Sequence, residues 1–593
     1  MKKEKFEESQ HYKLFHTAEH VFAQAISELY PGNIQLAVAH LDEDGFSNDA
    51  KWSHAITIEE LPKIEKKMQE IIKKDLPIRK EVVSYEQAKE LFKNNSFKLE
   101  WLEEIAAADK EISLYWTGDE YVDLCKGPHV ASTGKIKAFK LLSIAGAYWR
   151  ADEKNDMLTR VYGIAFESQQ ELEDYLQRLE EAKLRDHRKI GKDLDLFVFS
   201  ETVGKGLPLW TPRGATIRRE IERYIVDEEI RRGYLHVNTP DIARIQLYEK
   251  SGHYPYYKES MYAPIQDEDE QFMLRPMTCP HHFELYLSKQ RSYRELPMRI
   301  AELAQLYRYE KSGELSGLLR VRTFCLADAH IVAKPDQAKA MIAEVLDLIE
   351  DIAQTLGLKT GENYLFRLSL GDRNDTKKYF KDDASWEFAE NVLREVLIER
   401  KANYYEAENE AAFYGPKIDV QMKNVLGKED TAFTVQYDFV MPKRFKMAYI
   451  AEDGQEKEPI VIHRSSIGAI ERSIGFLIEH YAGSFPVWLH PEQVVIIPIG
   501  EEQKEYAREI AEKMKAAIPG IRLSVDEDNN TLGKRIRNAQ QQKVPYMLIL
   551  GKNEVANNTV SMRLRNGENS NDQTLEHVIE RISEKIREKS LEL

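Results

Sequence analysis

The sequence predicts an α+β protein of several domains, with an antiparallel sheet at its centre. The chain has 593 residues, and at about 150 residues per domain this length suggests about four domains, or three with a large one. In the middle of the chain, strand-like segments alternate apolar and polar residues, as at Val435, Tyr437 and Phe439, without the regular spacing of βαβ units. From about Pro491, continuous apolar runs alternate with helical stretches, which favours a small α/β domain around a partly parallel sheet.

A charged helical stretch, roughly Ser168 to Lys192, separates the first part of the chain from the rest. Its apolar residues form one narrow stripe, made of Leu172, Tyr175, Leu176 and Leu179. A narrow stripe among dense opposite charges suits a solvated connecting helix. We therefore expect a first domain over residues 1–165, a linker helix over 166–195, a large domain over 196–490 and a last domain over 491–593.

The strand signals of the large domain lie at residues 298–310, 318–332, 412–422 and 430–441. In the last domain, the apolar runs 494–500, 521–528 and 546–551 alternate with predicted helices at 501–517 and 533–542. Residues 576–593 read as a further amphipathic helix.

The composition excludes several classes of protein. A net charge of −16 excludes one that holds nucleic acid by bulk positive charge, although local basic grooves stay possible. Three cysteines, Cys125, Cys279 and Cys325, cannot build a disulfide framework, which favours a reducing compartment. The N-terminus has no apolar stretch typical of a secretory signal, and no apolar run approaches the ~20 residues that span a bilayer. We expect a cytoplasmic, soluble protein with no membrane partner.

The first candidate constellation combines His16 and His20 with the distant Cys125 and His129. His16 and His20 project from one face of a helix, because they are four residues apart. One cysteine and three histidines match the ligand count of a tetrahedral zinc site. A metalloprotease is disfavoured because Glu19 is one place away from the position that HExxH requires. Residue types alone leave metal binding open at this pocket.

The second constellation is a set of arginines in the large domain, namely Arg308 in RYE, Arg320 in RVRTF and Arg472 in GAIER. Strands and the start of a helix are expected to place these guanidinium forks around a triphosphate. Phe324 is suited to stack on a planar base. The chain has no Walker-type or kinase glycine loop, so nucleotide binding would use this other architecture.

The third constellation is Cys279 in TCPHH, His330 in ADAH and His463 in VIHR. Three N/S ligands leave one coordination position open, as in a zinc site that binds substrate. Taken singly, each residue is more often a buried thiol or a core histidine.

The motifs resemble those of class II aminoacyl-tRNA synthetases, specifically bacterial-type threonyl-tRNA synthetases. The resemblance covers nearly the whole chain and rests on HTAEH, YVDLCKGPHV, AGAYWR, RDHRKIGK, SGHYPYYKESMY, RPMTCPHH, YRYEKSGELSGLLRVRTF, AFYGPKID, TVQYDF, Gly468–Arg472 and VPYMLILG. It implies a class II antiparallel-sheet catalytic core, an N-terminal α+β editing domain and a C-terminal α/β anticodon-binding domain. The implied reaction joins L-threonine to ATP as threonyl-adenylate, then transfers threonine to tRNA(Thr).

The resemblance also assigns roles in the catalytic domain. Catalysis would involve Arg308, Glu310, Arg472, Lys417 and His253, with His253 assisting proton removal in the transfer step. ATP, with Mg²⁺, would contact Arg308, Arg320, Phe324 and Arg472, with adenine between Phe324 and Arg472. Threonine would contact Asp328, Tyr414 and Gln436. One Zn²⁺ per subunit, on Cys279, His330 and His463, would separate threonine from valine, which lacks the hydroxyl ligand.

Serine lacks only a methyl group, worth roughly 1 kcal/mol, so binding alone cannot exclude it. The family's editing domain hydrolyses Ser-tRNA(Thr), and here its pocket would consist of His16, His20, Lys98, Asp123, Cys125 and His129. In this family the histidines and cysteine are thought to work without metal, whereas related alanyl-type domains hold zinc. The anticodon bases of the tRNA would be contacted by Asn529, Arg537, Glu554 and Arg563. Residues 207–242 resemble motif 1, which forms the homodimer interface in class II enzymes.

The sequence departs from the family pattern at several places. The chain starts almost at the editing helix, where family members usually carry a small β-rich domain first. Leu326 and Thr431 stand where many relatives have Gln, Phe433 where Gly is frequent, and Thr531 where relatives have Lys. These departures put fine substrate and anticodon affinity in doubt, rather than the reaction.

Two other functions compete with this interpretation. A paralogue charging a different substrate is favoured if Cys279, His330 or His463 fails to bind metal. An RNA-binding regulator would keep the fold without adenylation, but it has no need of Arg308, Glu310, Arg320 and Arg472.

Overall fold

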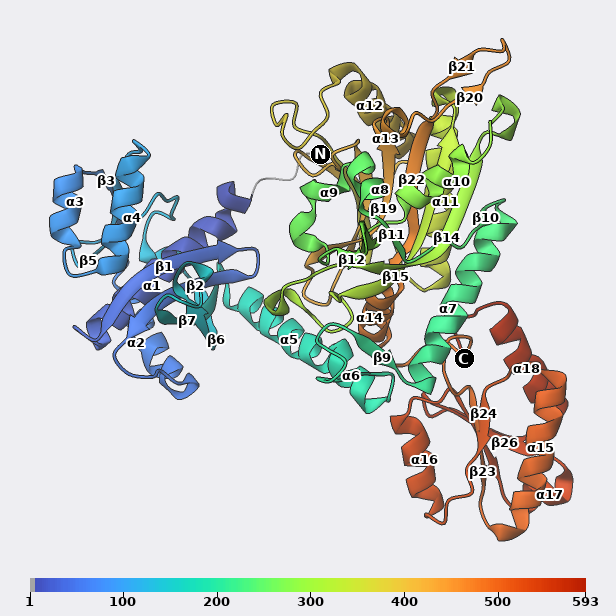
Figure 1. The fold of residues 1–593 in the computed structure, drawn as a ribbon. Helices are drawn as coiled ribbons and strands as arrows, with labels where there is room; N and C mark the ends of the chain where they lie inside the picture. Colours follow the sequence, from blue (N-terminus) through green and yellow to red (C-terminus); the bar gives the residue numbers. More distant parts are fainter. Residues whose placement is uncertain (1–5) are drawn as a thin grey trace. The chain divides into compact units, whose positions relative to one another are not determined.

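The computed structural model describes residues 6–593, which form two compact units (Figure 1). Residues 6–179 belong to one unit and residues 180–593 to the other. None of the helices within residues 6–593 has the length and apolar character that crossing a bilayer requires.

The first unit is built on a four-stranded antiparallel sheet covered by helices. The strands are β1 (Ile34–Asp42), β2 (Gly45–Trp52), β6 (Ala138–Tyr148) and β7 (Met157–Phe166), in the order β1-β2-β7-β6. Helix α1 (Gln10–Leu29) packs on this sheet and is buried on nearly all sides from Tyr12 to Ile26. Ser9 caps it by accepting a hydrogen bond from the Tyr12 backbone N–H. Burial of this part of the helix fixes the direction of the side chains that it carries, including those of His16 and His20.

Helix α2 (Leu61–Lys73) packs against α1 and β6 and shares their core. A smaller subdomain of the first unit contains β3 (Ile78–Val82), α3 (Tyr85–Leu91), α4 (Ser96–Ala107), β4 (Ser113–Thr117) and β5 (Tyr121–Leu124). Strands β3, β4 and β5 form an antiparallel sheet in that order. Cys125 therefore stands directly at the end of a strand.

The expected single linker helix is two helices, α5 (Gln169–Arg185) and α6 (His187–Asp193). Asp186 between them has non-helical dihedral angles, and its carboxylate accepts a hydrogen bond from the Arg188 backbone N–H. The chain stops one helix and caps the next at this residue. The prediction of a continuous helix was wrong here, because Asp186 competes for backbone donors as an N-cap.

The second unit is centred on an eight-stranded sheet. Its strands are β10 (Leu235–His236), β14 (Met298–Tyr307), β15 (Thr323–Ala333), β16 (Tyr364–Ser369), β17 (Tyr404–Ala407), β18 (Lys417–Lys423), β19 (Glu429–Asp438) and β22 (Ile460–Ala469). The order is β10-β14-β15-β22-β19-β18-β16-β17. All neighbours from β14 to β16 pair antiparallel, and only the two outermost pairs are parallel. This confirms the predicted antiparallel sheet.

Helices and short strands surround this sheet (Figure 1). The helices are α7 (Pro212–Arg231), α8 (Ile245–Ser251), α9 (His253–Tyr256), α10 (Cys279–Leu287), α11 (Ala338–Thr355), α12 (Asp383–Glu399), α13 (Met441–Phe445) and α14 (Ile470–Tyr481). The short strands are β8 (Phe197–Phe199), β9 (Pro208–Trp210), β11 (Ile242–Arg244), β12 (Ile265–Asp267), β13 (Glu270–Leu274), β20 (Tyr449–Ile450) and β21 (Glu456–Lys457). Helix α11 packs on β22 through Ile342, Val345 and Ile349, the three-to-four-residue spacing of an amphipathic helix.

The C-terminal part of the second unit has its own sheet, in the order β24-β23-β25-β26-β27. Its elements are β23 (Val494–Pro498), α15 (Lys504–Ala517), β24 (Leu523–Val525), α16 (Leu532–Gln541), β25 (Tyr546–Leu550), α17 (Lys552–Asn557), β26 (Val560–Leu564), β27 (Asn569–Gln573) and α18 (Leu575–Arg587). The first three strands of this order are parallel and the last two pair antiparallel, as the predicted partly parallel sheet requires. The last helix ends at Arg587, earlier than the sequence pattern suggested.

Candidate functional site

Cys279, His330 and His463, here called the central cluster, come together from three separate elements. Cys279 begins α10, and His330 and His463 are direct cross-strand partners on β15 and β22. Directly opposed residues of neighbouring strands point to the same face of a sheet. One N or S atom from each residue lies within 4.8 Å of the others, and all three side chains are buried.

The donors of the central cluster fit a Zn²⁺ ion. His463 Nε2 lies 2.8 Å from Asp438 Oδ2, and His330 Nδ1 lies 2.8 Å from His282 Nδ1. Each imidazole is therefore oriented through one nitrogen and keeps the other for an ion, as in many zinc sites. Burial raises the pKa of the Cys279 thiol well above its usual value, so a thiolate there needs a cation beside it.

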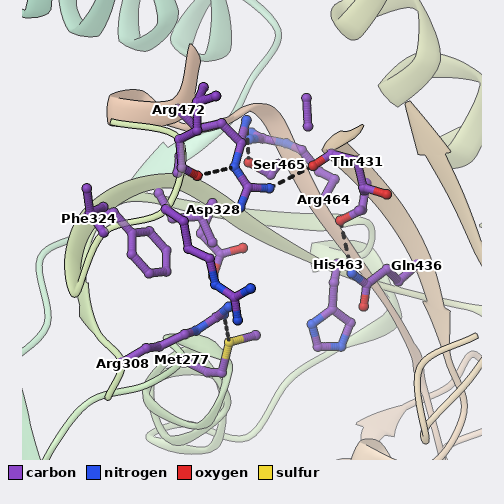
Figure 2. Close-up of a pocket in the computed structure, with 18 of the residues that line it drawn as sticks. Met277, Arg308, Phe324, Asp328, Thr431, Gln436, His463, Arg464, Ser465 and Arg472 are labelled. Carbon is purple, nitrogen blue, oxygen red and sulfur yellow. Dashed lines mark hydrogen bonds between the residues drawn. The ribbon is translucent and has the colours of Figure 1, made fainter. Parts of the chain in front are cut away.

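A cavity of about 400 Å³ adjoins the central cluster and carries the predicted arginines. Arg308 follows β14, Arg472 is in the first turn of α14, and Arg320 lies in the loop before β15. The expectation that strands and a helix start hold all three was therefore wrong for Arg320. Figure 2 shows Arg308, Phe324, Asp328, His463 and Gln436 around this one space.

Arg308 and Arg472 are cations without a carboxylate partner, since no ion pair joins either of them to an acid within residues 6–593. Arg308 donates to Met277 Sδ at 3.1 Å and lies 5.0 Å over the ring of Phe324. Arg472 donates to the backbone oxygens of Leu319 and Thr431. Burial lowers the pKa of both guanidinium groups. Partly buried cations that face a cavity and have no direct carboxylate contact are suited to an anionic ligand.

Arg320 is different, because its guanidinium already pairs with Glu310 at 2.8 Å and with Glu314 at 3.2 Å. Glu310 therefore orients Arg320 at the entrance of the cavity.

The predicted threonine contacts line the same cavity. Asp328 lies on β15, and its Oδ2 is 3.9 Å from His330 Nε2. Gln436 on β19 is the cross-strand partner of His463 and accepts a hydrogen bond from the Tyr414 hydroxyl. The Tyr414 ring stacks on His463 at 4.9 Å. Charged and polar groups therefore surround the open side of the central cluster.

A glycine allows two strands that line this cavity, β22 and β19, to approach each other closely. Gly468, at the end of β22, has φ +72°, and a Cβ there would lie 2.1 Å from the backbone oxygen of Ala432. Only glycine fits this close approach. Strand β22 then continues directly into α14, which carries Arg472.

A second cavity, of about 570 Å³, shares Arg308, Glu310 and Tyr414 with the first and adds His253 and Lys417 to the site. Lys417 donates to Asp419 Oδ2 at 2.5 Å. His253 is buried, and burial lowers its pKa to about 3, so its imidazole is neutral at pH 7. Its Nδ1 lies 2.7 Å from Ser251 Oγ.

The first unit contains a second group of histidines and a cysteine, the N-terminal cluster, made of His16, His20, Cys125 and His129. Helix α1 holds His16 and His20, and their donor atoms lie within 4.8 Å of those of Cys125 and His129. Cys125 Sγ is 3.1 Å from His16 Nε2 and 3.2 Å from His129 Nε2. Burial lowers the pKa of His16 to about 4 and raises that of Cys125 to about 12, so both are neutral at pH 7.

A cavity of about 890 Å³ opens beside the N-terminal cluster and is also lined by Lys98 and Asp123. Lys98 Nζ and Asp123 Oδ1 form a buried ion pair of 2.7 Å. Glu19 lines this cavity too, and its carboxylate accepts a hydrogen bond from Asn48 Nδ2. Burial raises the pKa of Glu19 to about 7. The sequence drew attention to Glu19 only as a misplaced HExxH residue.

The predicted anticodon contacts lie at the C-terminal sheet. Glu554 is in the first turn of α17 and accepts hydrogen bonds from Gly551 N and Ser561 Oγ. Arg563 on β26 donates to Asn569 Oδ1 at 3.0 Å. Asn529, before α16, and Arg537, on α16, are exposed. The four residues therefore sit on two separate segments, 529–537 and 554–563.

Sequence reasoning missed the residues that orient the central cluster, namely Asp438, His282 and Glu302. The pair His281-His282 beside Cys279 was a visible signal, but only the folded structure tells which of the two faces His330. Asp438 and Glu302 carried no motif signal.

Comparison with known proteins gives matches along the chain. Residues 257–481 match the tRNA synthetase class II core domain (G, H, P, S and T), residues 493–585 an anticodon binding domain, and residues 112–162 the threonyl and alanyl tRNA synthetase second additional domain. A threonine–tRNA ligase of Geobacillus sp. (strain WCH70) is 49% identical over 577 residues, 97% of this chain and 88% of that protein. Threonine–tRNA ligase 1 of Bacillus subtilis (strain 168) is 49% identical over 569 residues, 95% of this chain and 87% of that protein.

Among solved structures, the RNA binding domain of threonyl-tRNA synthetase from Cryptosporidium parvum Iowa II is similar, with a TM-score of 0.62 and 33% identity. The match covers 67% of this chain and 98% of that one.

Proposed function

Because the chain belongs to the threonine–tRNA ligase family, we propose how its residues divide the work of charging and editing. The chain is a class II ligase that attaches L-threonine to tRNA(Thr) with ATP and Mg²⁺, and it hydrolyses Ser-tRNA(Thr). We retain the division into residues 1–165 for editing, 166–195 as linker, 196–490 for catalysis and 491–593 for the anticodon.

The central cluster is proposed to hold one Zn²⁺ through Cys279, His330 and His463. The observation that carries this proposal is the convergence of three buried N/S donors within 4.8 Å, two of them from His330 and His463 in the wall of the cavity. A Zn²⁺ held there would supply an open coordination position for the amino group and hydroxyl of threonine, which valine cannot fill. Asp328, Tyr414 and Gln436 would orient the amino acid beside it.

Arg308 and Arg472 are proposed to bind the phosphates of ATP, with Arg320 held for the same task by Glu310. Their fixed guanidinium groups stabilise the charge that develops when the carboxylate of threonine attacks the α-phosphorus and pyrophosphate leaves. Phe324 would pack against adenine, and Lys417 would sit near the phosphates. Positioning and electrostatics are the whole contribution of these side chains.

His253 is proposed to accept a proton in the transfer of threonine to the tRNA 3′ end. Ser251 Oγ donates to the Tyr248 backbone oxygen, so it can only accept from His253 Nδ1. The neutral ring then keeps its Nε2 lone pair, which is the form that a general base needs.

The N-terminal cluster, with Lys98 and Asp123, is proposed to hydrolyse the serine ester without a metal ion. His16 and His129 both direct a ring nitrogen at the Cys125 thiol. If the part of this cavity that receives the amino acid is sized for serine, it would exclude the additional methyl of threonine, as in a double sieve.

We propose that tRNA(Thr) binds through Asn529, Arg537, Glu554 and Arg563.

We also propose that the protein is a cytoplasmic homodimer whose subunits pair through residues 207–242. Large apolar side chains are exposed on and beside this segment, which supports an interface. They are Val198, Phe199, Val203, Leu209, Ile230, Leu235 and Ile242.

A threonine-dependent ATP–pyrophosphate exchange assay, run with metal analysis of the pure protein, tests the proposed site. We expect exchange with threonine, none with valine, and about one zinc per chain. Exchange without bound metal would contradict the zinc assignment, and absence of exchange would favour an RNA-binding regulator.

A further inference from the structure

A buried row of polar side chains leads away from the central cluster on the side opposite the cavity. His330 Nδ1 lies 2.8 Å from His282 Nδ1, and His282 Nε2 lies 3.2 Å from Glu302 Oε2. Glu302 Oε1 in turn accepts a hydrogen bond of 3.0 Å from Arg275 Nη1. All four residues are at most 3% exposed, so water cannot replace these contacts.

The direction of the hydrogen bonds is set at Glu302. Its Oε1 accepts from Thr239 N and Arg275 Nη1, and its Oε2 accepts from Thr239 Oγ1. Burial opposes ionisation, but the bonds from His282 and Thr239 and the charge of Arg275 lower the pKa of Glu302 to about 2. An ionised carboxylate only accepts hydrogen bonds, so His282 Nε2 must carry a proton.

That proton decides the state of the next ring. When His330 offers its Nε2 lone pair to an ion, the ring carries its proton on Nδ1 and donates it to His282 Nδ1. His282, with its proton on Nε2 facing Glu302, has the Nδ1 lone pair that accepts this bond. The remaining nitrogen of His330, Nε2, is left without a proton. It lies on the side of Asp328, at 3.9 Å from Oδ2, where the cavity is.

We propose that Glu302 and His282 are positioning residues that fix the tautomer of His330, so that its Nε2 lone pair is permanently available to a metal ion. This inference rests on the proposed zinc site and adds the residues that set its affinity without touching the ion. Supporting partners of this kind typically change metal affinity by about 10–100-fold. The row also connects the ion site to Thr239, at the end of the predicted dimer segment.

Glu302→Gln tests the tautomer directly, because its amide can adopt only one orientation. The position of Oε1 faces two obligatory donors, Thr239 N–H and Arg275 Nη1, so the amide oxygen must stay there. The amide NH₂ then faces His282 Nε2 and donates to it. The proton of His282 moves to Nδ1, that of His330 to Nε2, and the lone pair for the ion is lost. Asp241→Asn is the matched control, since Asp241 contacts Arg275 on its other side.

The measurement is the Zn²⁺ dissociation constant of the full chain in competition with a chromophoric chelator, with the Co²⁺ absorption spectrum as a second signal. We expect Glu302→Gln to weaken binding about 10–100-fold and to change the Co²⁺ spectrum, and Asp241→Asn to stay within about twofold of wild type. Zinc should also raise the Tm of Glu302→Gln less than that of wild type. A purely structural role would lower the Tm of the metal-free and metal-bound protein equally and leave the dissociation constant unchanged.

The neighbouring histidines give a second, independent pair of variants. His281 is buried like His282, but neither of its ring nitrogens has a hydrogen-bond partner within residues 6–593. His282→Asn removes the fixed orientation and is expected to weaken zinc several-fold, whereas His281→Asn should not. This pair decides the question if Glu302→Gln does not fold.

The outcomes separate this inference from the zinc assignment. Wild-type affinity in Glu302→Gln, or in His282→Asn where Glu302→Gln does not fold, together with zinc loss in Cys279→Ala, would overturn the tautomer proposal and keep the zinc site. Equal zinc binding by wild type and Cys279→Ala would instead overturn the zinc site.

Discussion

The central and N-terminal clusters use the same donor atoms but support them differently. At the central cluster, His463 contacts a carboxylate directly and His330 reaches one through His282. At the N-terminal cluster, the outer nitrogen of His16 faces the Pro128 backbone oxygen and that of His129 faces Thr17 Oγ1. Neutral acceptors orient a ring without supplying negative charge.

This difference predicts different chemistry from similar residues. Carboxylate support raises the basicity of an imidazole ligand and offsets the charge of a bound cation. Without it, the N-terminal cluster presents two imidazole lone pairs to a neutral thiol, which suits proton transfer during hydrolysis. The environment of the rings therefore predicts metal binding at one cluster and acid–base chemistry at the other, where the residue types alone do not.

The largest expected effect is that of Cys279→Ala. Loss of one of three ligands should remove bound zinc and reduce threonine-dependent exchange by more than the roughly 100-fold that a supporting residue contributes. Hydrolysis of preformed Ser-tRNA(Thr) should be retained, because it belongs to the other cluster. Metal analysis and the two assays on the same preparation check this. Joint loss of both activities in a folded variant would show that the clusters do not act separately.

Cys125→Ala tests the opposite separation, in which the N-terminal cluster is impaired and the central cluster is intact. It should slow hydrolysis of Ser-tRNA(Thr) by about 10²–10⁴-fold, the usual contribution of acid–base groups, and leave threonine activation unchanged. Deacylation of preformed Ser-tRNA(Thr) measures the effect, with His16→Ala as a companion variant. If both variants hydrolyse the ester at the wild-type rate, these residues have no part in editing.

Asp438→Asn is expected to have a smaller effect on the central cluster. Asp438 Oδ1 accepts from the backbone N–H groups of Val440 and Met441, so the amide nitrogen of Asn must face His463 Nε2. Zinc affinity should fall about 10–100-fold. The chelator competition measures it, with the exposed Asp453→Asn as control. An unchanged affinity would mean that carboxylate support does not distinguish the two clusters.

The smallest expected effect concerns the stability of the N-terminal unit at acid pH. The pKa of His16 falls from 6.5 in the unfolded chain to about 4 in the folded one, so the unfolded chain binds more protons between these values. The contribution of His16 to the free energy of unfolding is therefore fully present above pH 6.5 and is lost as the pH falls towards 4. His16 alone should contribute about 2 kcal/mol to the loss between pH 7 and pH 5.

Thermal unfolding of wild type, His16→Asn and the exposed His11→Asn over this pH range measures the contribution of His16. The pH dependence of the Tm should weaken only in His16→Asn. Equal pH dependence in all three proteins would mean that the His16 ring is not buried as a neutral group.

Sequence reasoning reached the fold and the donor residues because both depend on local pattern. Alternation at Val435, Tyr437 and Phe439 predicted the antiparallel sheet, and the motif around Cys279 predicted one member of the central cluster. The residues that orient the central cluster could not be predicted from the sequence. Glu302 and His330, for example, lie on neighbouring strands, and their register exists only in the folded sheet. The break at Asp186 was missed for a related reason, since an Asp within a charged helical pattern carries no breaker signal as strong as Pro or Gly.

Strand β22 and helix α14 are one uninterrupted segment that contains His463, Gly468 and Arg472. At Gly468 the segment lies so close to the backbone oxygen of Ala432 that no side chain fits between them. A change that shifts His463 would therefore also shift Arg472, so the proposed ion site and the proposed nucleotide contact are coupled through one segment. Directed evolution should leave residues 460–472 untouched and vary Tyr414 and Gln436, which reach the same space from other parts of the chain.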